Sequence, residues 1–320
     1  MKVLVTGGAG FIGSHACERF LRDGHQVLAV DDLSTGKLEN LADVLDQEPF
    51  RFTEMDIVAA EFREVVAAFR PDVVVHLAAQ MDVRKSVADP LADARVNVLG
   101  TVQLLTAASQ CGTERIVFAS SGGTVYGEPD AVPVPETAPL RPLSPYGAAK
   151  VAGEAYVSAF ARLYGMQYCT LVLGNVFGPR QDPHGEAGVV AIFARALLSG
   201  APSRIFGGGT SIRDYVHVED VVEALWRAAE GMGDGQRVNI GSGRGTSIRE
   251  LHTTIARVVG ARDEPDFAPV RLGELERIVL DVSAAQAAMG WSPRISLEEG
   301  LVGTVRWICD TRQGYRVESL

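Results

Sequence analysis

Short apolar runs alternate along this chain with longer segments in which apolar residues recur at helical spacing. Runs rich in valine, isoleucine and leucine predict strands, and the Ala-, Leu- and Arg-rich segments between them predict helices. Continuous apolar strands separated by helices are typical of a parallel sheet that is covered on both faces. The predicted strands lie at 2–7, 26–32, 72–79 and 115–120, and the predicted helices at 13–24, 61–70 and 93–112.

This alternation predicts an α/β fold with a doubly wound parallel sheet, in which ligands bind beyond the carboxyl ends of the strands. After about residue 174, glycine and proline become dense and the alternation weakens. We interpret the later part as a smaller, interleaved α/β region for substrate, with elements near 214–231 and 237–243 returning to the first domain. The predicted domains are 1–173 with about 210–240, and about 174–209 with 241–320.

Composition narrows the class of protein. Of 320 residues, 47% are hydrophobic and 22% charged, which is typical of a globular protein, and the formal net charge of -10 disfavours nucleic-acid and membrane partners. No long apolar run and no signal peptide is recognised, so we expect no membrane span and a cytoplasmic location. The four cysteines lack the spacing of a metal site or a disulfide framework, so no metal is expected.

Three glycines follow the first predicted strand in the segment TGGAGFIGSH. Gly7, Gly10 and Gly13 have the spacing G-x-x-G-x-x-G between a strand and a helix. Glycine lets the backbone approach a ligand closely, and the helix N-terminus offers free N–H groups and a positive dipole end to a pyrophosphate. The context therefore predicts a dinucleotide-binding loop.

Acidic residues end the second predicted strand. Asp31 at that position would accept hydrogen bonds from both ribose hydroxyls of adenosine and would repel a 2′-phosphate, which favours NAD over NADP. Asp32 is placed to share or replace that role, with a turn or cap residue as the alternative. Asp56 and Ile57 are candidates for the edge and face of the adenine, with a strand-ending Asp as the alternative.

A tyrosine and a lysine in the segment SPYGAAK carry the candidate chemistry. Tyr146 and Lys150 stand four residues apart, on one face of a helix that Ser144 would cap and Pro145 would begin. An unperturbed tyrosine has a pKa of about 10, so a base near neutral pH needs it lowered by roughly three units, about 4 kcal/mol. We expect Lys150, an oxidised nicotinamide and the helix N-terminus to act in that direction.

Eight segments carry a resemblance that covers essentially the whole chain: TGGAGFIGSH, HLAAQ, NVLGT, SSGGTVYGE, SPYGAAK, GNVFGPRQDPHGEAGVV, IFGGGTSIRDYVHVEDV and NIGSG. With them the chain resembles the extended short-chain dehydrogenase/reductase superfamily, and within it the nucleotide-sugar 4-epimerases. The resemblance implies a Rossmann-like NAD-binding domain, a nucleotide-sugar-binding domain and a homodimer.

The implied activity is 4-epimerisation of a UDP-hexose, UDP-glucose or UDP-galactose, with NAD as the cofactor. Tyr146 would take the proton of the sugar 4-hydroxyl while NAD takes the C4 hydride, and both would return after the 4-keto sugar has turned in its pocket. A base that becomes an acid within one cycle is served by a near-neutral pKa. UDP-glucuronate and UDP-N-acetylhexosamine stay open as alternative substrates. A non-catalytic NAD-binding regulator is disfavoured because Tyr146 and Lys150 are both present.

The resemblance also implies which residues bind each ligand. The catalytic residues would be Tyr146, Lys150 and Ser121. The cofactor-binding residues would be Gly7, Gly10, Phe11, Ile12, Gly13, Asp31, Asp32, Asp56, Ile57, Leu77, Ala78, Ala79, Asn97, Tyr146 and Lys150. The substrate-binding residues would be Ser121, Tyr146, Asn175, Arg180, Val189, Phe206, Arg213, Arg271 and Glu274.

For substrate binding, the resemblance implies separate contact residues for the phosphates, the uracil and the ribose of the nucleotide. Asn175 would meet the phosphates, and Phe206 would stack on uracil, with core packing as its alternative role. Arg213 and Arg271 would pair with the pyrophosphate, since planar cationic forks match phosphate oxygens, and surface ion pairs are their alternative. Glu274 would hold ribose hydroxyls.

The stretch SSGGTVYGE offers three hydroxyls for the family's proton relay. Counting back from VYG places the relay on Gly122, whereas counting along the strand from Phe118 places it on Ser121. We take the strand count, since a Gly-Gly turn can absorb an insertion, so Ser120 is interpreted as buried and Thr124 as the second choice. The turn carries no acid where related dehydratases and decarboxylases have one, which favours epimerisation.

Further positions bear on specificity or structure. Arg180 lies near the place where an arginine of uronate-handling relatives binds the sugar carboxylate, and Ile278 lies where a bulky tyrosine of some hexose epimerases restricts N-acetylated sugars. Asp220 is predicted to cap a helix. His76 and His217 are predicted to be hydrogen-bonded structural residues.

Overall fold

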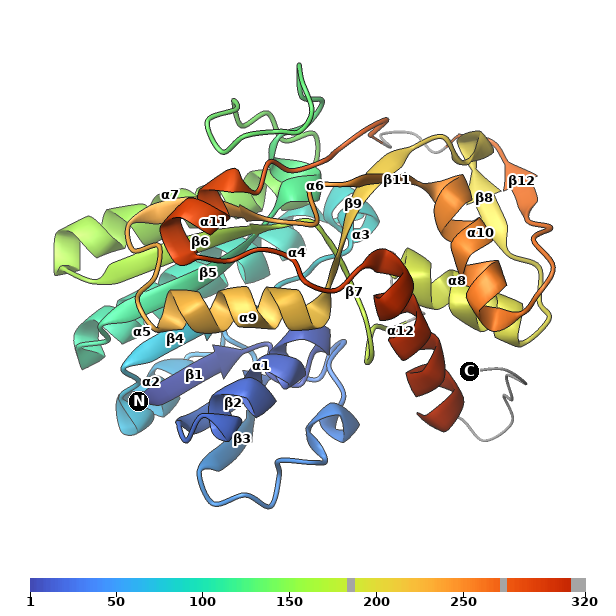
Figure 1. Ribbon diagram of the computed structural model, residues 1–320. Coiled ribbons are helices and arrows are strands. Elements are labelled where there is room, and N and C mark those ends of the chain that lie inside the picture. The colour runs from blue at the N-terminus through green and yellow to red at the C-terminus, as the bar shows by residue number, and fades with distance from the viewer. Residues whose placement is uncertain (183–187, 271–274, 312–320) are drawn as a thin grey trace.

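Seven parallel strands form the large sheet of the computed structural model, which describes residues 1–182, 188–270 and 275–311 (Figure 1). Their order, β10-β6-β5-β4-β1-β2-β3, is that of a doubly wound sheet whose topological switch lies between β1 and β4, so the predicted Rossmann-like fold is confirmed. The strands are β1 (Lys2–Thr6), β2 (Gln26–Asp31), β3 (Phe50–Glu54), β4 (Val73–His76), β5 (Arg115–Ser121), β6 (Gln167–Leu173) and β10 (Gln236–Ile240).

Helices cover both faces of this sheet because its strands are apolar on both sides. In β1, Val3 and Val5 belong to the core on one face and Leu4 to the core on the other, since successive side chains of a strand alternate. One face is covered by α1 (Phe11–Arg22) and α9 (Val218–Ala229), the other by α2 (Phe62–Phe69), α5 (Thr101–Cys111) and α7 (Pro145–Tyr164) (Figure 1). Within the described ranges, no helix is both long and apolar enough to cross a bilayer.

The smaller part of the molecule is built mainly from elements that follow β6. Its sheets are β11 (Gly245–Ser247), β9 (Ile212–His217) and β7 (Asn175–Phe177), and the pair β12 (Asp266–Ala268) and β8 (Arg204–Phe206). Around them pack α8 (Val189–Leu198), α10 (Ile248–Val259) and α12 (Leu297–Thr311), while α11 (Ser283–Met289) lies beside α9 and β10. Of the segment expected to return to the first domain, α9 and β10 join the layers of the large sheet, whereas β9 pairs in the small one.

The helix predicted for 93–112 is present, and the prediction of a regular α-helix is wrong only in its interior, which contains a π-helical turn. The chain forms α4 (Pro90–Ala94), a π-helical turn η2 (Arg95–Gly100) and then α5, preceded by the short α3 (Val83–Ala88). A Cβ at Gly100 would lie 2.6 Å from Ile57 Cδ1, so the turn packs its glycine directly on the core. Such π-helical insertions are frequent at functional sites, and this one contains Asn97.

The predicted capping role of Asp220 is also wrong. His217 caps α9, where its Nδ1 accepts the Glu219 N–H at 3.3 Å. Asp220 lies in the first turn of the helix, and its carboxylate accepts the backbone N–H groups of Arg294 and Ile295 at 3.0 and 3.1 Å. Its role is to fasten the segment before α12 to α9.

Candidate active site

The carboxyl end of β5 and the first turns of α7 bring Ser121, Tyr146 and Lys150 together. Ser144 caps α7 as predicted, with its Oγ accepting the Gly147 N–H at 3.1 Å, and a proline takes the first helical position. Tyr146 therefore lies in the first turn, where its phenol oxygen is hydrogen-bonded by the Ser121 side chain. The Lys150 Nζ lies 5.8 Å from the centre of the Tyr146 ring.

Lys150 is held in a buried position under the end of β5. Its Nζ donates to the Ala119 carbonyl at 2.9 Å and lies 5.1 Å from the centre of the Phe118 ring. Burial lowers the pKa of Lys150 to about 8, although the nearby carboxylates of Glu154 and Asp93 act in the opposite direction. The ammonium group is therefore poised to lose a proton only slightly above neutral pH.

The pKa of Tyr146 departs from the prediction. Burial raises it to about 12, the hydrogen bond from Ser121 lowers it in part, and the charge of Asp93 raises it further. The chain alone does not supply the expected lowering, which included the charge of an oxidised nicotinamide, because the cost of desolvating a phenolate outweighs the hydrogen bond that stabilises it.

The turn after β5 decides which hydroxyl faces Tyr146. Ser120 is 4% exposed and donates to Glu154, so it is structural as predicted. A Cβ at Gly122 would lie 2.8 Å from Leu280 Cδ1, so no side chain fits there without displacing the core. Thr124 turns back to donate to the Ser121 carbonyl at 3.4 Å. Ser121 is thus the hydroxyl that the structure brings to the tyrosine.

The glycine loop between β1 and α1 is closed too tightly for side chains. Gly7 has a φ of +71°, and a Cβ there would lie 2.8 Å from the Ala78 nitrogen. A Cβ at Gly13 would overlap the Gly7 carbonyl oxygen. Gly10 is the N-cap residue of α1, and as a glycine it has no side chain that could bond the first N–H groups of the helix. Phe11 and Ile12 begin the helix, so its first N–H groups have no partner in a preceding turn. This cradle fits a pyrophosphate, which backbone N–H groups bind at a helix start.

Of the two acidic residues at the end of β2, Asp31 lies against the glycine loop. Its buried carboxylate accepts the N–H groups of Ala9 at 3.0 Å and Leu33 at 2.9 Å. Burial raises the pKa of Asp31, and these hydrogen bonds act against the rise. Asp32 is exposed, and its Oδ1 accepts the N–H and the hydroxyl of Ser34 at 3.0 and 2.6 Å, as in the alternative turn role.

The two adenine candidates are placed differently from each other. Asp56 closes the turn after β3, where its Oδ1 accepts the Val58 N–H at 3.0 Å. Ile57 is 4% exposed and packs into the core against Gly100, so its side chain offers little surface to a ligand.

The loop after β4 is fastened by a buried amide. Leu77, Ala78 and Ala79 are partly buried there, and the N–H of Ala78 donates to Thr6 Oγ1 at 3.3 Å. The side chain of Asn97 accepts the Gln80 N–H and donates to the Gln80 carbonyl, both at 2.9 Å, and donates to Asp93 Oδ1 at 2.9 Å. Its position supports the loop rather than presenting free donors. Neither Gln80 nor Asp93 was predicted to take part, although HLAAQ ends on Gln80 and Asp93 precedes Asn97 by one helical turn.

The substrate-side residues lie on elements of the smaller part. The N-terminal residue of β7, Asn175, lies near the turn after β5, with its Oδ1 4.0 Å from the place of a Cβ at Gly123. Arg213 in β9 donates to the Ile212 carbonyl at 2.9 Å. Phe206 ends β8 and Val189 begins α8. The two remaining candidates, Arg271 and Glu274, lie outside the described residues.

Comparison with known proteins matches residues 3–241 to the model of the NAD dependent epimerase/dehydratase family. The chain belongs to this family. It is 51% identical to the UDP-glucose 4-epimerase of Mycolicibacterium smegmatis over 98% of this chain and 100% of that protein.

Two solved structures agree with this family membership. The crystal structure of the Thermotoga maritima UDP-glucose 4-epimerase with UDP-glucose is 44% identical, with a TM-score of 0.93 over 97% of this chain and 99% of that one. The Thermus thermophilus UDP-glucose 4-epimerase in complex with NAD is also 44% identical, with a TM-score of 0.89 over 96% and 98% of the two chains.

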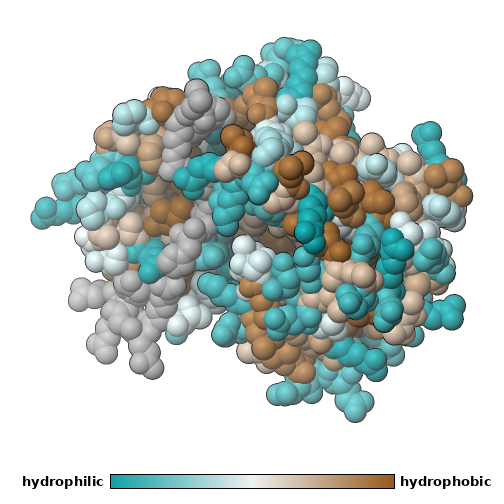
Figure 2. All heavy atoms as spheres, turned by 180° about the vertical axis from the view of Figure 1, so that it is seen from behind, coloured by the Kyte–Doolittle hydropathy of each residue, from teal (hydrophilic) through white to brown (hydrophobic). Residues whose placement is uncertain are grey.

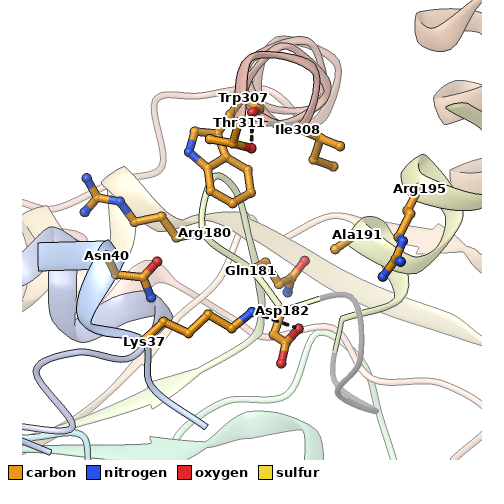
Figure 3. A pocket seen from close by; sticks show the side chains of 10 residues that line it. All are labelled: Lys37, Asn40, Arg180, Gln181, Asp182, Ala191, Arg195, Trp307, Ile308 and Thr311. Carbon is orange, nitrogen blue, oxygen red and sulfur yellow. Dashed lines mark hydrogen bonds and ion pairs between the residues drawn. The ribbon is translucent and has the colours of Figure 1, made fainter. Parts of the chain in front are cut away.

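Arg180, which was predicted to bind substrate, lines a cavity that is separate from the catalytic candidates in this epimerase/dehydratase-family chain. Arg180 has a φ of +68° and forms ion pairs with Glu18 of α1 and, at 3.8 Å, with Asp43. It lines a cavity of about 60 Å³ in which Lys37 Nζ lies 3.6 Å from Asp182 Oδ1 (Figure 3). The residues that line this cavity are Lys37, Asn40, Arg180, Gln181, Asp182, Ala191, Arg195, Trp307, Ile308 and Thr311, and Ser121, Tyr146 and Lys150 are not among them.

Ile278, the second position that was predicted to bear on substrate specificity, is buried. Ile278 is 2% exposed and packs with Val125, Tyr126 and Leu280 in a small core cluster. Its side chain therefore faces protein rather than an open sugar site in this structure.

The histidines are hydrogen-bonded, as predicted. His76 is 2% exposed and bonds Thr6 Oγ1 at 2.7 Å and Thr101 Oγ1 at 3.0 Å. Because Thr101 donates to the Asn97 carbonyl and Thr6 accepts the Ala78 N–H, the hydrogen-bond directions match a neutral imidazole protonated at Nε2. His217 caps α9, as described above.

A Ser–His–Asp chain of hydrogen bonds, which was not predicted, lies in the smaller part. Ser203 Oγ lies 2.5 Å from His252 Nε2, and His252 Nδ1 lies 2.7 Å from Asp263 Oδ1. The order of groups is that of a hydrolytic triad. However, Ser203 is 4% exposed and His252 is fully buried beneath Phe193, so no substrate carbonyl can reach the hydroxyl. The three residues join β8, α10 and the following loop.

Proposed function

We propose that this chain is a UDP-glucose 4-epimerase, which interconverts UDP-glucose and UDP-galactose through a transient 4-keto sugar. The observation that carries this proposal is the cluster of Ser121, Tyr146 and Lys150 at the carboxyl end of β5, beside a glycine loop that fits a dinucleotide. The 51% identity to an epimerase over nearly the full chain supports it.

The cofactor of the proposed reaction is NAD. The loop that begins α1 would hold its pyrophosphate, and the Asp31 carboxylate would accept hydrogen bonds from its adenosine ribose. Leu77, Ala78 and Ala79 would line it from β4. Bound there, NAD supplies the acceptor and donor of the hydride at the sugar C4.

The chain's own residues supply the proton transfer. Tyr146 accepts the proton of the sugar 4-hydroxyl and later returns it, and Ser121 bridges the two oxygens with its hydroxyl. The Lys150 ammonium, fixed by the Ala119 carbonyl, stabilises the phenolate through its charge. Because the same tyrosine acts as base and acid, the reaction leaves the enzyme unchanged.

The nucleotide of the substrate would bind to the smaller part of the molecule. We assign the phosphates to Asn175, Arg213 and Arg271, the uracil to Phe206, the ribose to Glu274, and Val189 to the wall of the site. In this assignment, residues 1–173 with α9 and β10 carry the cofactor, and the other elements after β6, β9 with Arg213 among them, carry the nucleotide sugar.

Two observations favour a neutral hexose and epimerisation over the related reactions. One terminal nitrogen of the Arg180 guanidinium pairs with the carboxylates of Glu18 and Asp43, and the cavity that Arg180 lines does not include Ser121, Tyr146 or Lys150, which disfavours a contact with the carboxylate of a hexuronate. The turn at Gly122 and Gly123 carries no acid that would protonate a leaving hydroxyl, as elimination requires.

We further propose that the protein is a cytoplasmic homodimer. Large apolar side chains are exposed on α4, η2 and α7, with exposed fractions of 81% for Leu91, 61% for Leu99 and 73% for Leu163. Figure 2 shows hydrophobic residues among hydrophilic ones on the face opposite to that of Figure 1. A two-fold axis would let the exposed apolar side chains of these helices pack against those of a second copy. Sedimentation of the wild type and of Leu163→Glu tests the dimer: a monomeric wild type overturns it.

The decisive test of the function is conversion of UDP-galactose to UDP-glucose by the purified protein with NAD. We expect turnover by the wild type and a loss of about 100-fold or more in Tyr146→Phe, which keeps the ring and removes the proton acceptor. UDP-glucuronate, run in parallel, should turn over poorly. A protein that binds NAD but acts on neither UDP-hexose, or a Tyr146→Phe variant with full activity, overturns the proposal.

A further inference from the structure

A buried carboxylate at the end of α4 has no role in the reaction described so far. Asp93 is 1% exposed, and its Oδ1 accepts hydrogen bonds from Gln80 Nε2 and Asn97 Nδ2, both at 2.9 Å. Its Oδ2 is also buried and has no hydrogen-bond partner among the described residues. An unpaired oxygen of this kind costs about 1–3 kcal/mol or more, so its position calls for a compensating interaction.

Burial raises the pKa of Asp93, and the hydrogen bonds from Gln80 and Asn97 together with the charge of Lys150 act against the rise and favour its carboxylate form. The helix α4 packs on α7, and the Asp93 carboxylate interacts electrostatically with both Lys150 and Tyr146. The other carboxylate near Lys150 is Glu154, whose two oxygens are bonded by Ser120 and, at 2.6 Å, by Arg237. His76 also faces Lys150 and is neutral, since burial lowers its pKa to about 3.

We propose that Asp93 is a positioning residue for the catalytic pair: its single buried charge favours the protonated forms of both Lys150 and Tyr146, and so sets the pH range in which they transfer a proton. This inference rests on the proposed epimerase reaction. A negative charge stabilises the ammonium and destabilises the phenolate, so it shifts both groups in the same direction. Gln80 and Asn97 fix the carboxylate and at the same time fasten it to the loop that follows β4.

The variant Asp93→Asn tests the charge with little change of shape. In the pH profile of kcat/KM, the acidic limb reports ionisation of Tyr146 and the alkaline limb deprotonation of Lys150. We expect both limbs to move to lower pH, because loss of the negative charge disfavours the ammonium and favours the phenolate. Asp93→Glu, which keeps the charge, should leave both limbs near their wild-type positions.

Glu154→Gln is the matched control. Glu154 acts on Lys150 but is not among the groups that shift Tyr146, so this variant should move the alkaline limb alone. If Asp93→Asn lowers the rate without moving either limb, Asp93 is a structural anchor for Gln80 and Asn97, and the proposal is overturned. If Asp93→Asn does not fold, Asp93→Ser replaces it, because it also removes the charge and leaves room for a water between the two amides. The same movement of both limbs to lower pH is expected for this variant.

A second measurement separates this inference from the proposed function. The ionisation of Tyr146 can be followed by carbon NMR of ring-labelled tyrosine in the NAD-bound protein, with Tyr146→Phe to assign the signal. This titration needs no sugar substrate, so a wild type inactive on UDP-hexoses would refute the function and still leave Asp93 testable. A Tyr146 titration that is the same in wild type and Asp93→Asn refutes the role of Asp93.

Discussion

Replacing Ser121 with alanine removes the hydroxyl that the structure brings to Tyr146. A hydrogen bond to a neutral group contributes about 0.5–1.5 kcal/mol, and one to a charged group about 1.5–3 kcal/mol. Because Tyr146 carries charge only as the proton moves, the loss falls on the transition state. At about 1.4 kcal/mol per tenfold change, kcat should fall by about 10- to 150-fold, with little change in KM.

The matched control is Thr124→Val, which removes the competing hydroxyl. Thr124 donates to the Ser121 carbonyl at 3.4 Å, a long contact, so its loss should change kcat by less than about threefold. The assay is the initial rate of UDP-galactose conversion at saturating substrate, with circular dichroism to check folding. The reasoning is refuted if Ser121→Ala keeps the wild-type kcat, or if Thr124→Val is the more damaging of the two.

Three further predictions follow from buried groups elsewhere in the fold. Gly13→Ala should abolish NAD retention, measured by the absorbance of the purified protein, because the new Cβ would overlap the Gly7 carbonyl oxygen. As a control, Gly303→Ala in α12, where a Cβ meets no atom within 4 Å, should stabilise the protein by about 0.5–1 kcal/mol. Burial lowers the pKa of His76 to about 3, so below about pH 6.5 the unfolded state takes up a proton that the native state does not. Stability should therefore fall as pH falls from about 6.5 towards 3, by up to about 1.4 kcal/mol per pH unit, and His76→Gln should flatten this slope in denaturant titrations. Ser203→Ala should cost about 1–3 kcal/mol of stability with kcat unchanged; a large loss of epimerase activity in a folded variant would contradict the structural role of the Ser–His–Asp chain.

The sheet was predictable because its signal is local. Buried parallel strands are apolar on both faces, and β1, β2, β4 and β5 were each recognised from such runs. The edge strand β3 has a half-exposed pattern and left no comparable run. The π-helical turn η2 was missed because it depends on tertiary contacts, of Gly100 with Ile57 and of Asn97 with Gln80, that helical periodicity does not encode.

The candidate site also contains both features that local sequence predicts and features that depend on tertiary contacts. Ser144, Tyr146 and Lys150 sit on one helix, where spacing alone fixes their relation, and the glycine loop is likewise continuous in sequence. The positions of the Asp93 and Arg180 side chains depend on contacts between separate segments. Asp93 accepts a hydrogen bond from Gln80, and Arg180 forms an ion pair with Glu18 of α1. Identifying the relay hydroxyl required the space around Gly122, which the side chain of Leu280 fills.

The raised pKa of Tyr146 changes how activation of the base is understood. With a pKa of about 12, Tyr146 in the chain alone is almost entirely protonated near neutral pH. The hydrogen bond from Ser121 favours ionisation of Tyr146, and the charge of Asp93 works against it. The chain alone therefore favours protonated Tyr146, and in the proposed reaction its ionisation depends on the positive charges of Lys150 and of an oxidised nicotinamide. This dependence couples proton transfer to cofactor state, because loss of the ring's positive charge on reduction favours protonation of Tyr146 again. Burial of Tyr146, which opposes a base in isolation, thus suits a residue that must return its proton within each cycle.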